Sequence, residues 1–225
     1  MGRNGFHGPE DTQKVLAYFE TTATGFAAIY ESPRLVDRIF RCDMYERFRR
    51  TLQACDPSSG RSVLDIGCGS GQYVTALAER GAREVVGLDF ATNMLRIAAD
   101  NARRAGVADK CRFVAGDFLT YPFDRRFDYV IAVGLFDYIA EPRPFLYRAR
   151  ELTTGKFVAT FPRVLTWRAL VRKARLRLAG CPVFFYTRRR VGDLLRQAGF
   201  AVERNEVCGK IYFATARPSR QGEVR

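Results

Sequence analysis

Three glycines on alternate positions follow a short apolar run, a pattern that can hold a nucleoside. The run Val63–Ile66 has strand-forming character, and a helical pattern begins at Tyr73. Between them lie Gly67, Gly69 and Gly71. Glycine reaches positive φ angles without strain and leaves no side chain between the backbone and a ligand. The free amides at the start of the helix then face that ligand.

An aspartate at the end of the next apolar run strengthens this interpretation. Glu84–Leu88 is typical of a strand, and Asp89 follows it, where its carboxylate can accept hydrogen bonds from two ribose hydroxyls. A dinucleotide fingerprint would need its third glycine at position 72, which is Gln72 here. The alternative is a tight turn beside an unrelated surface aspartate. The spacing of the glycines relative to Asp89 favours a nucleoside site.

Four segments in this order and spacing resemble the motifs of the class I S-adenosylmethionine-dependent methyltransferases. Val63–Gly71 resembles the first motif and Val85–Asp89 the acidic motif of the second strand. Gly116–Phe118 resembles the third motif, and Phe127–Gly134 resembles the fourth strand. The resemblance implies that S-adenosyl-L-methionine is the cofactor and that the chain is a methyltransferase. It leaves the acceptor open.

The resemblance also implies a role for individual residues. The carboxylate of Asp117 would accept from the adenine amine, although the alternative for Asp117 is a turn residue. The Phe118 amide would donate to a ring nitrogen, and Phe90 or Met94 would lie against the adenine. The carbonyl of Ala132 or Val133 would hold the methionine ammonium. The predicted cofactor-binding residues are Asp65, Gly67, Gly69, Gly71, Asp89, Phe90, Met94, Asp117, Phe118, Val133 and Tyr18.

The elements that must hold these residues alternate between strand and helix from residue 61 onward. The predicted strands are Ser62–Ile66, Glu84–Leu88, Cys111–Ala115, Phe127–Val133 and Lys156–Phe161. The predicted helices are Tyr73–Arg80, Thr92–Ala105 and Pro144–Leu152, with Leu35–Ala54 before the first strand and Thr187–Ala198 after the fifth. Such alternation predicts a parallel sheet whose ligands bind beyond the carboxyl ends of the strands.

The predicted fold class is α/β, a Rossmann-like and mostly parallel seven-stranded sheet with helices on both faces. The resemblance implies that Ala201–Val207 and Lys210–Ala216 close the sheet as an antiparallel hairpin. Residues 1–58 are predicted as an N-terminal helical lid and residues 59–216 as the methyltransferase domain. A basic insertion spans residues 163–186 of that domain, and residues 217–225 are predicted as a flexible tail.

Aromatic residues of the lid are candidates to cover the sulfonium. In the family such a segment folds over the cofactor, and an electron-rich ring beside a cation is favourable. Tyr18, Phe19 and Tyr30 are the candidates. The alternative is that these rings only pack a helix onto the domain.

The insertion has the pattern of a basic amphipathic helix. Residues 163–190 contain nine arginines and lysines and no acid. Apolar residues recur at helical spacing: Trp167, Leu170, Val171, Ala174 and Leu178. One interpretation is a structural insertion with a solvated basic face. The other is a cap that recruits an anionic substrate or touches an acidic membrane surface.

Composition limits the kinds of partner, metal site and cellular compartment that the sequence allows. The formal charge of +13 favours anionic partners. Six cysteines without a CxxC pair and one histidine, His7, make no convincing metal site and suggest a reducing compartment. Residues 1–10 lack the apolar stretch of a signal peptide, and no apolar run reaches the length of a membrane span. We therefore expect a cytoplasmic protein.

The acceptor is expected to be a small molecule. Short segments at both ends, around Tyr18–Tyr30 and Phe185–Phe213, weakly resemble the magnesium-protoporphyrin O-methyltransferases, which methylate a carboxylate of a flat molecule. The catalytic candidates are Asp137, Tyr138 and Tyr30, although a carboxylate acceptor would need no base.

Two alternatives are a nucleic-acid (RNA) methyltransferase and a cofactor-binding partner without activity. The fourth strand ends in Ala132-Val133-Gly134-Leu135 rather than in an Asn/Asp-Pro-Pro-aromatic motif. The sequence also shows no separate RNA-binding module. We therefore expect no stable nucleic-acid partner.

Overall fold

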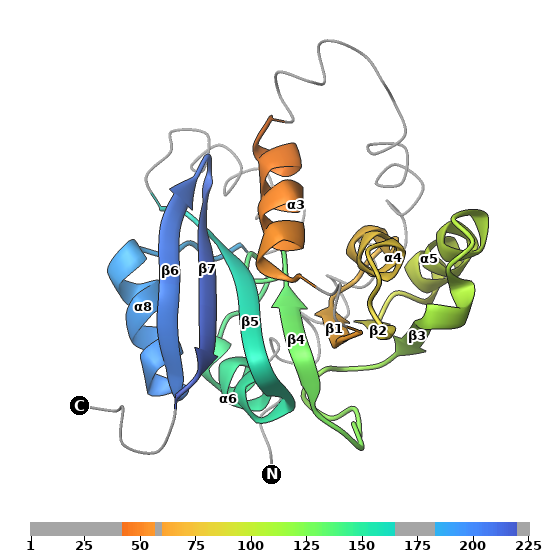
Figure 1. Ribbon diagram of the computed structural model, residues 1–225. Helices are drawn as coiled ribbons and strands as arrows, with labels where there is room; N and C mark the ends of the chain where they lie inside the picture. The colour runs from red at the N-terminus through yellow and green to blue at the C-terminus, as the bar shows by residue number, and fades with distance from the viewer. Residues whose placement is uncertain (1–41, 57–59, 165–182, 220–225) are drawn as a thin grey trace.

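A computed structural model describes residues 42–56, 60–164 and 183–219 (Figure 1). The helices are α3 (Cys42–Ala54), α4 (Gln72–Glu79), α5 (Thr92–Arg104), α6 (Pro142–Leu152) and α8 (Arg188–Gln197), with a short 3-10 helix at Ala108–Lys110. The strands are β1 (Ser62–Ile66), β2 (Glu84–Asp89), β3 (Cys111–Ala115), β4 (Phe127–Ala132), β5 (Thr153–Pro162), β6 (Phe200–Cys208) and β7 (Ile211–Pro218).

The seven strands form one sheet in the order β3-β2-β1-β4-β5-β7-β6. The first five strands in this order pair in parallel, and β7 pairs antiparallel with both β5 and β6. The predicted fold class, including the closing hairpin, is therefore confirmed. Of the predicted N-terminal lid, the structure describes α3 and the two residues after it, and the rest lies outside the described residues.

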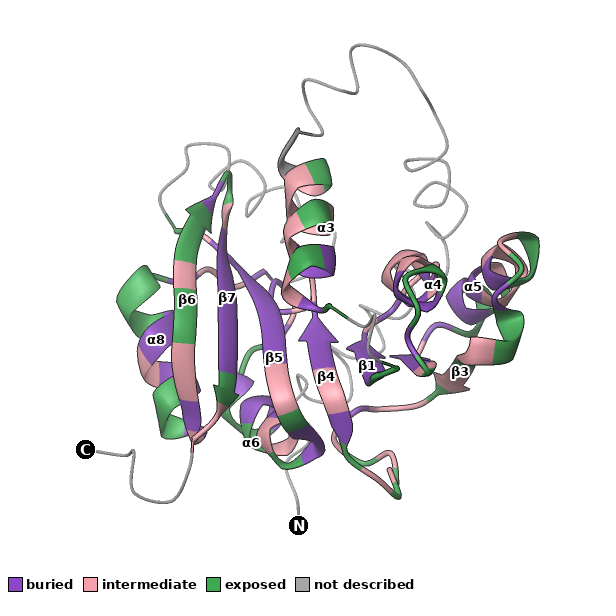
Figure 2. Ribbon diagram, viewed as in Figure 1, coloured by how far each residue is buried: buried purple, intermediate pink, exposed green. Residues whose placement is uncertain are grey.

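Helices cover both faces of the sheet because the buried strands are apolar on both sides. Leu64 and Ile66 of β1 join the cluster that packs under α6 and α8. Val63, which precedes Leu64 and faces the other side of the sheet, joins the cluster under α3, α4 and α5. Figure 2 shows β1 and much of β4, β5 and β7 as buried, whereas most of the outermost strand β6 is not.

Phenylalanine rings fill the space beneath the segment that joins β4 to α6. The ring of Phe136 lies 4.2 Å from that of Phe161 and 5.1 Å from that of Phe145, centroid to centroid. Phe145 in turn lies 4.6 Å from Phe118. Offset and edge contacts of this kind add to the burial energy. They fix the segment that follows β4, which carries two of the catalytic candidates.

Arginine side chains clamp neighbouring elements through backbone carbonyls. Arg148 of α6 donates to the carbonyls of Phe118 and Tyr121, beyond β3. Arg150 donates to the carbonyls of Gly199 and Ser219 at 2.8 and 3.1 Å. These forks tie α6 to three segments that are distant in the sequence.

The prediction differs from the structure most at β5, which begins at Thr153 rather than at Lys156. In the sequence, Thr154-Gly155 is typical of a turn that precedes a strand. In the structure a Cβ on Gly155 would lie 2.6 Å from the carbonyl oxygen of Asp128, at a register shift between β4 and β5. Glycine therefore permits a close strand approach here.

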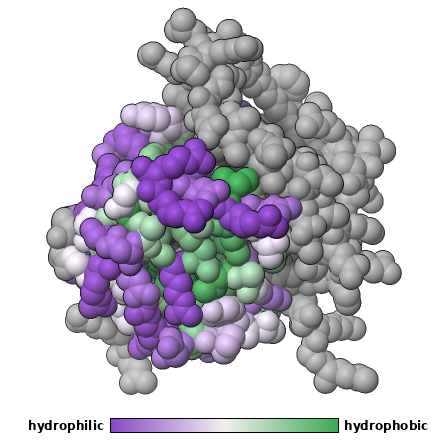
Figure 3. All heavy atoms as spheres, turned by 90° about the vertical axis from the view of Figure 1, so that its right-hand side faces the viewer, coloured by the Kyte–Doolittle hydropathy of each residue, from purple (hydrophilic) through white to green (hydrophobic). Residues whose placement is uncertain are grey.

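At the opposite edge of the sheet, β3 is only partly covered. Phe113 and Val114 of β3 are partly buried. Figure 3 looks onto this side of the molecule, where apolar side chains gather near the centre and hydrophilic ones lie above them and to their left. Within the described parts of the chain, none of the helices has the length and apolar character needed to cross a bilayer.

Candidate functional site

The glycine turn is attached directly to the end of the neighbouring strand. The amides of Gly67 and Cys68 both donate to the carbonyl of Leu88, at 2.8 and 3.1 Å. Gly67, Gly69 and Gly71 have φ angles of 71°, 53° and 76°, which a side chain would disfavour. The predicted need for glycine at these three positions is thus visible in the backbone.

The glycines differ in what surrounds them. A Cβ on Gly69 would meet nothing within 4 Å, so space is open beside this residue. A Cβ on Gly71 would lie 2.7 Å from Cβ of Ala98 on α5 and 3.2 Å from the ring of Phe113. Gly69 therefore leaves room for a ligand, whereas Gly71 is also needed to pack α4 against its neighbours.

Asp89, at the end of β2, holds the same turn. Its carboxylate accepts from the amide of Gly69 at 2.8 Å and from that of Ala91 at 2.9 Å. Burial raises the pKa of this carboxyl, and its hydrogen bonds to backbone amides oppose the shift. Two oxygens that each accept one bond still have lone pairs for other donors.

Phe90 and Met94 stand beside Asp89, at the start of α5. Met94 is 5 % exposed and forms a small cluster with Ala91, against which Phe90 and Ile97 pack. An apolar surface of this kind suits a flat base. That Phe90 or Met94 contacts adenine remains a prediction.

Asp65 is a carboxyl group buried under the turn. It is 2 % exposed, and its Oδ2 has no hydrogen-bond partner among the described residues. Burial, and secondarily the charge of Asp89, raises the pKa of Asp65 to about 8. A cation near this carboxyl would favour its ionised form.

Asp117 and Phe118 follow β3, next to the end of β2. The amide of Gly116 donates to the carbonyl of Asp89 at 3.0 Å, which brings the two strand ends together. The Asp117 carboxylate accepts from the amide of Leu119 at 2.9 Å, a turn contact. The Phe118 side chain lies in the core, 1 % exposed, so only its backbone could take part in binding.

The end of β4 brings in a cation that the sequence did not indicate. Val133 is half-buried, and the amide of Gly134 donates to Oγ1 of Thr160 at 2.9 Å. A Cβ on Gly134 would lie 3.3 Å from the Arg47 guanidinium, which reaches over from α3. No motif marks Arg47 in the sequence, because its place depends on how α3 packs on the sheet.

The described catalytic candidates lie on the segment between β4 and α6. Asp137 is 9 % exposed, and its carbonyl accepts from the amide of Phe184 at 2.9 Å. Tyr138 is half-buried, and its amide donates to the carbonyl of Leu135. Tyr18 and Tyr30 lie outside the described residues, as does His7.

Most of the predicted cofactor residues thus gather at the carboxyl ends of the parallel strands. Asp65, Asp89 and Val133 lie at or near the carboxyl ends of β1, β2 and β4, which are neighbours in the sheet. The open side of Gly69 and the carboxylate of Asp89 fit the methionine and ribose parts of a nucleoside cofactor. Among the described residues no cluster of three His, Cys, Asp or Glu side chains is arranged to hold a metal ion.

Comparison with known proteins indicates a methyltransferase domain. Residues 63–154 match the model of a family described as a methyltransferase domain. The chain is 31 % identical over 118 residues to a demethylmenaquinone methyltransferase of Shouchella clausii, covering 49 % of this chain and 48 % of the relative. It is 35 % identical over 105 residues to a ubiquinone biosynthesis O-methyltransferase of Cereibacter sphaeroides, covering 47 % and 42 %. The chain therefore spans about half the length of these curated relatives.

Solved structures extend the likeness to nearly the whole chain. The magnesium protoporphyrin IX methyltransferase of Synechocystis PCC 6803, solved with bound SAH, superposes with a TM-score of 0.78 at 20 % identity, covering 93 % of this chain and 100 % of that one. The [4+2]-cyclase SpnF superposes with a TM-score of 0.71 at 16 % identity, covering 96 % and 99 %. At these identities the likeness concerns the fold. Residues 63–154 thus match a methyltransferase domain, and the chain shares the fold of these solved structures.

Proposed function

We propose that this chain transfers a methyl group from S-adenosyl-L-methionine to a small-molecule acceptor. The open side of Gly69, next to the Asp89 carboxylate at the carboxyl ends of β1 and β2, carries the proposal. The space beside Gly71, in contrast, is filled by Ala98 and Phe113.

The residues of the site bind and orient. When bound, the cofactor supplies an activated methyl group on a sulfonium. Asp89 would accept from the ribose hydroxyls while keeping its bonds to the turn, and the carbonyl of Val133 would accept from the methionine ammonium. Arg47, beside Gly134, would donate to the methionine carboxylate. Holding donor and acceptor in line can supply much of the acceleration for such a transfer.

The acceptor is proposed to carry an anionic group on a partly apolar body. Two observations support this choice: the basic charge of the chain, and the quinone and porphyrin methyltransferases named among its relatives and structural neighbours. Asp137 and Tyr138 lie after β4 and would contact the acceptor. If the acceptor atom carries a proton at working pH, one of these side chains would accept it.

The test is to find where the methyl group goes. The purified chain would be incubated with methyl-labelled S-adenosylmethionine and with small-molecule, lipid and nucleic-acid fractions of a cell extract. We expect label in a small molecule, and the yield should fall in Asp89→Ala but not in Asp109→Ala, an exposed aspartate of the 3-10 helix. Label found only in nucleic acid, or equal yields from the two variants, would contradict the proposal.

A further inference from the structure

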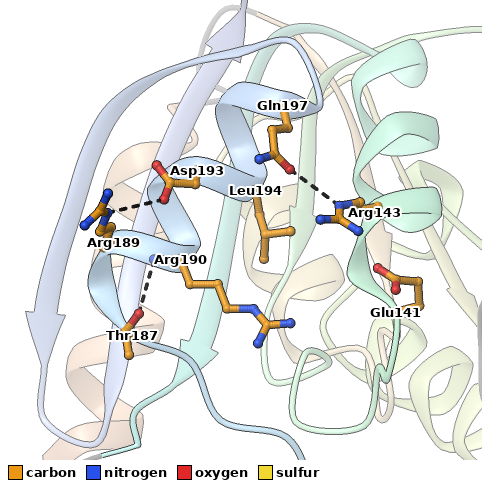
Figure 4. A pocket seen from close by; sticks show the side chains of 8 residues that line it. All are labelled: Glu141, Arg143, Thr187, Arg189, Arg190, Asp193, Leu194 and Gln197. Atoms are coloured by element: carbon orange, nitrogen blue, oxygen red, sulfur yellow. Dashed lines mark hydrogen bonds and ion pairs between the residues drawn. The ribbon is translucent and has the colours of Figure 1, made fainter.

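A second polar site lies between α6 and α8, apart from the predicted cofactor residues. It is a groove of about 350 Å³ (Figure 4). None of the residues proposed to bind S-adenosylmethionine lines it. The lining residues are Glu141, Arg143, Thr187, Arg189, Arg190, Asp193, Leu194 and Gln197.

The first turns of both helices carry positively charged side chains, which are unfavourable at the start of a helix. The start of a helix has a partial positive charge, so acidic residues are favourable there and cations are not. Arg143 lies in the first turn of α6, and Arg188, Arg189 and Arg190 form the first turn of α8. Neither first turn contains an acid, and the one acidic cap residue is Glu141, the N-cap of α6. A bound anion would offset this local conflict.

One carboxylate of the groove is already neutralised. Asp193 pairs with Arg196 at 2.7 Å and with Arg189 at 3.8 Å, both on its own helix. Figure 4 shows Arg189 turned toward Asp193, on the side of α8 away from α6. Asp193 is thus engaged on α8, and Glu141, the other carboxylate of the groove, forms no ion pair with Arg143 or Arg190 among the described residues.

Arg143 and Arg190 are the other two cations of the groove. In the described parts of the chain no carboxylate lies within ion-pair distance of either guanidinium. Arg143 makes a long contact of 3.4 Å to the neutral amide oxygen of Gln197. Arg190 lies over the ring of Tyr186, with 5.8 Å between its guanidinium carbon and the ring centroid, and extends into the space beside α6 (Figure 4).

We propose that this groove binds the oxyanion group of a small molecule, a phosphate or a carboxylate, between Arg143 and Arg190. Guanidinium groups present paired donors that match such oxyanions. The start of α8 is held by its own cap, since the side chain of Thr187 accepts from the amide of Arg190 at 3.2 Å. The positive end of α8 therefore has a fixed position beside the two cations.

The groove adjoins the segment proposed to contact the acceptor. Glu141, in its lining, ends the segment that carries Asp137. Tyr186, beneath Arg190, donates through its hydroxyl to the carbonyl of Ile139 at 3.3 Å. The site nevertheless shares no residue with the proposed methyl-transfer machinery, so it can be tested by binding alone.

The experiment is calorimetric titration of the full chain with inorganic phosphate and, in a second arm, with citrate. Both titrations use low ionic strength, because salt screens exposed cations, and sodium chloride serves as the blank. We expect saturable binding of at least one of the two anions. The combined variant Arg143→Gln, Arg190→Gln should weaken that binding by roughly tenfold or more, because it removes both charge-assisted donors.

Matched variants separate a local site from general basic charge. Arg103→Gln with Arg104→Gln removes two exposed charges from the end of α5 and should leave anion affinity within about twofold of wild type. Glu141→Gln should tighten binding, and Glu151→Gln, at the far end of α6, should not. Thermal melting checks that each variant is folded.

Two results would overturn the proposal. Binding that weakens equally in the groove variant and in the α5 variant would overturn the proposal. So would the absence of saturable binding of both phosphate and citrate by the wild-type chain. Because the readout is anion binding, a failure of the proposed methyl transfer would not affect this test.

Discussion

The amide of Gly69 donates a hydrogen bond of 2.8 Å to the carboxylate of Asp89, so that the glycine turn and the end of β2 form one unit. The same carboxylate accepts from Ala91 at the start of α5. Asp89 thus has two tasks in the proposed site. It shapes the turn that makes room for the cofactor, and it faces the ribose with its remaining lone pairs.

Replacing Asp89 should therefore affect binding more than stability. We expect Asp89→Ala to weaken S-adenosylmethionine binding by about 1.5–3 kcal/mol, because ribose hydroxyls and a turn amide lose a charged acceptor. Asp89→Asn, which keeps one acceptor oxygen, should fall between this variant and wild type. Titration calorimetry measures both, with Asp109→Ala as the exposed control. Unchanged affinity in a folded Asp89→Ala variant would remove this residue from the site.

The glycine turn allows a sharper test, because Gly69 borders open space whereas Gly71 is packed against other residues. Gly69→Val should abolish cofactor binding, since the side chain would enter the space that is open beside Gly69. Gly71→Ala should instead destabilise the fold by roughly 1–3 kcal/mol, because its Cβ would overlap Ala98. Urea unfolding and calorimetry separate the two effects.

The control for Gly69→Val is Gly106→Val, after α5. Gly106 also has a positive φ, 71°, and nothing within 4 Å of a Cβ, so the backbone strain is matched. We expect Gly106→Val to retain cofactor affinity. If both valine variants bind the cofactor as wild type does, the cofactor lies elsewhere.

Asp65 should make stability depend on pH. Its pKa in the folded protein is about 8, against an ordinary value of 3.8. Between these values the folded protein keeps a proton that the unfolded chain releases, so the free energy of unfolding falls as pH rises through this window. Asp89 acts in the same direction, since its pKa is also raised.

Asp65→Asn should remove most of this slope while preserving the shape of the buried side chain. The measurement is the melting temperature between about pH 5 and pH 8, where the folded and unfolded carboxyls differ in protonation. Asp109→Asn, at an exposed position, should keep the wild-type slope. An Asp65→Asn variant with the wild-type pH dependence would show that other groups cause it.

Arg47 tests the methionine end of the proposed site. Because its guanidinium lies beside Gly134, at the end of β4, we expect Arg47→Gln to weaken cofactor binding by about 1.5–3 kcal/mol, the range for a hydrogen bond to a charged group. Arg49→Gln, on the same helix, loses a pair with Glu46 at the surface and should bind normally. Equal affinities for the two variants would refute the role of Arg47.

The alternation of apolar runs with helical patterns was enough to predict the parallel part of the sheet, whereas the closing hairpin of β6 and β7 was predicted from the family resemblance. The bounds of α5 and β2 differ from the prediction by one residue at their carboxyl ends. β5 was predicted to start too late, since Gly155 is typical of a turn in sequence. Its role depends on the carbonyl of Asp128 in another strand, which local pattern cannot indicate.

The candidate site residues that lie at strand ends could be proposed from the sequence. Asp89 could be found because it follows a strand and a glycine turn precedes it. Arg47 could not, because only the packing of α3 brings it to Gly134. The groove between α6 and α8 was missed for the same reason, since β5 separates these helices in the sequence. The predictions for Tyr18, Tyr30 and the basic residues 165–182 lie outside the described residues.

The arginine clamps on α6 change how the charge of this protein should be understood. Arg148 and Arg150 act as multi-point connectors, each joining α6 to two carbonyls of other segments. A lysine would keep the charge and lose the fork, because an ammonium is a single point of donation. Surface redesign that exchanges arginine for lysine would thus leave the isoelectric point almost unchanged and still loosen the domain. In this chain, some of the arginines therefore hold backbone segments together rather than only adding positive charge.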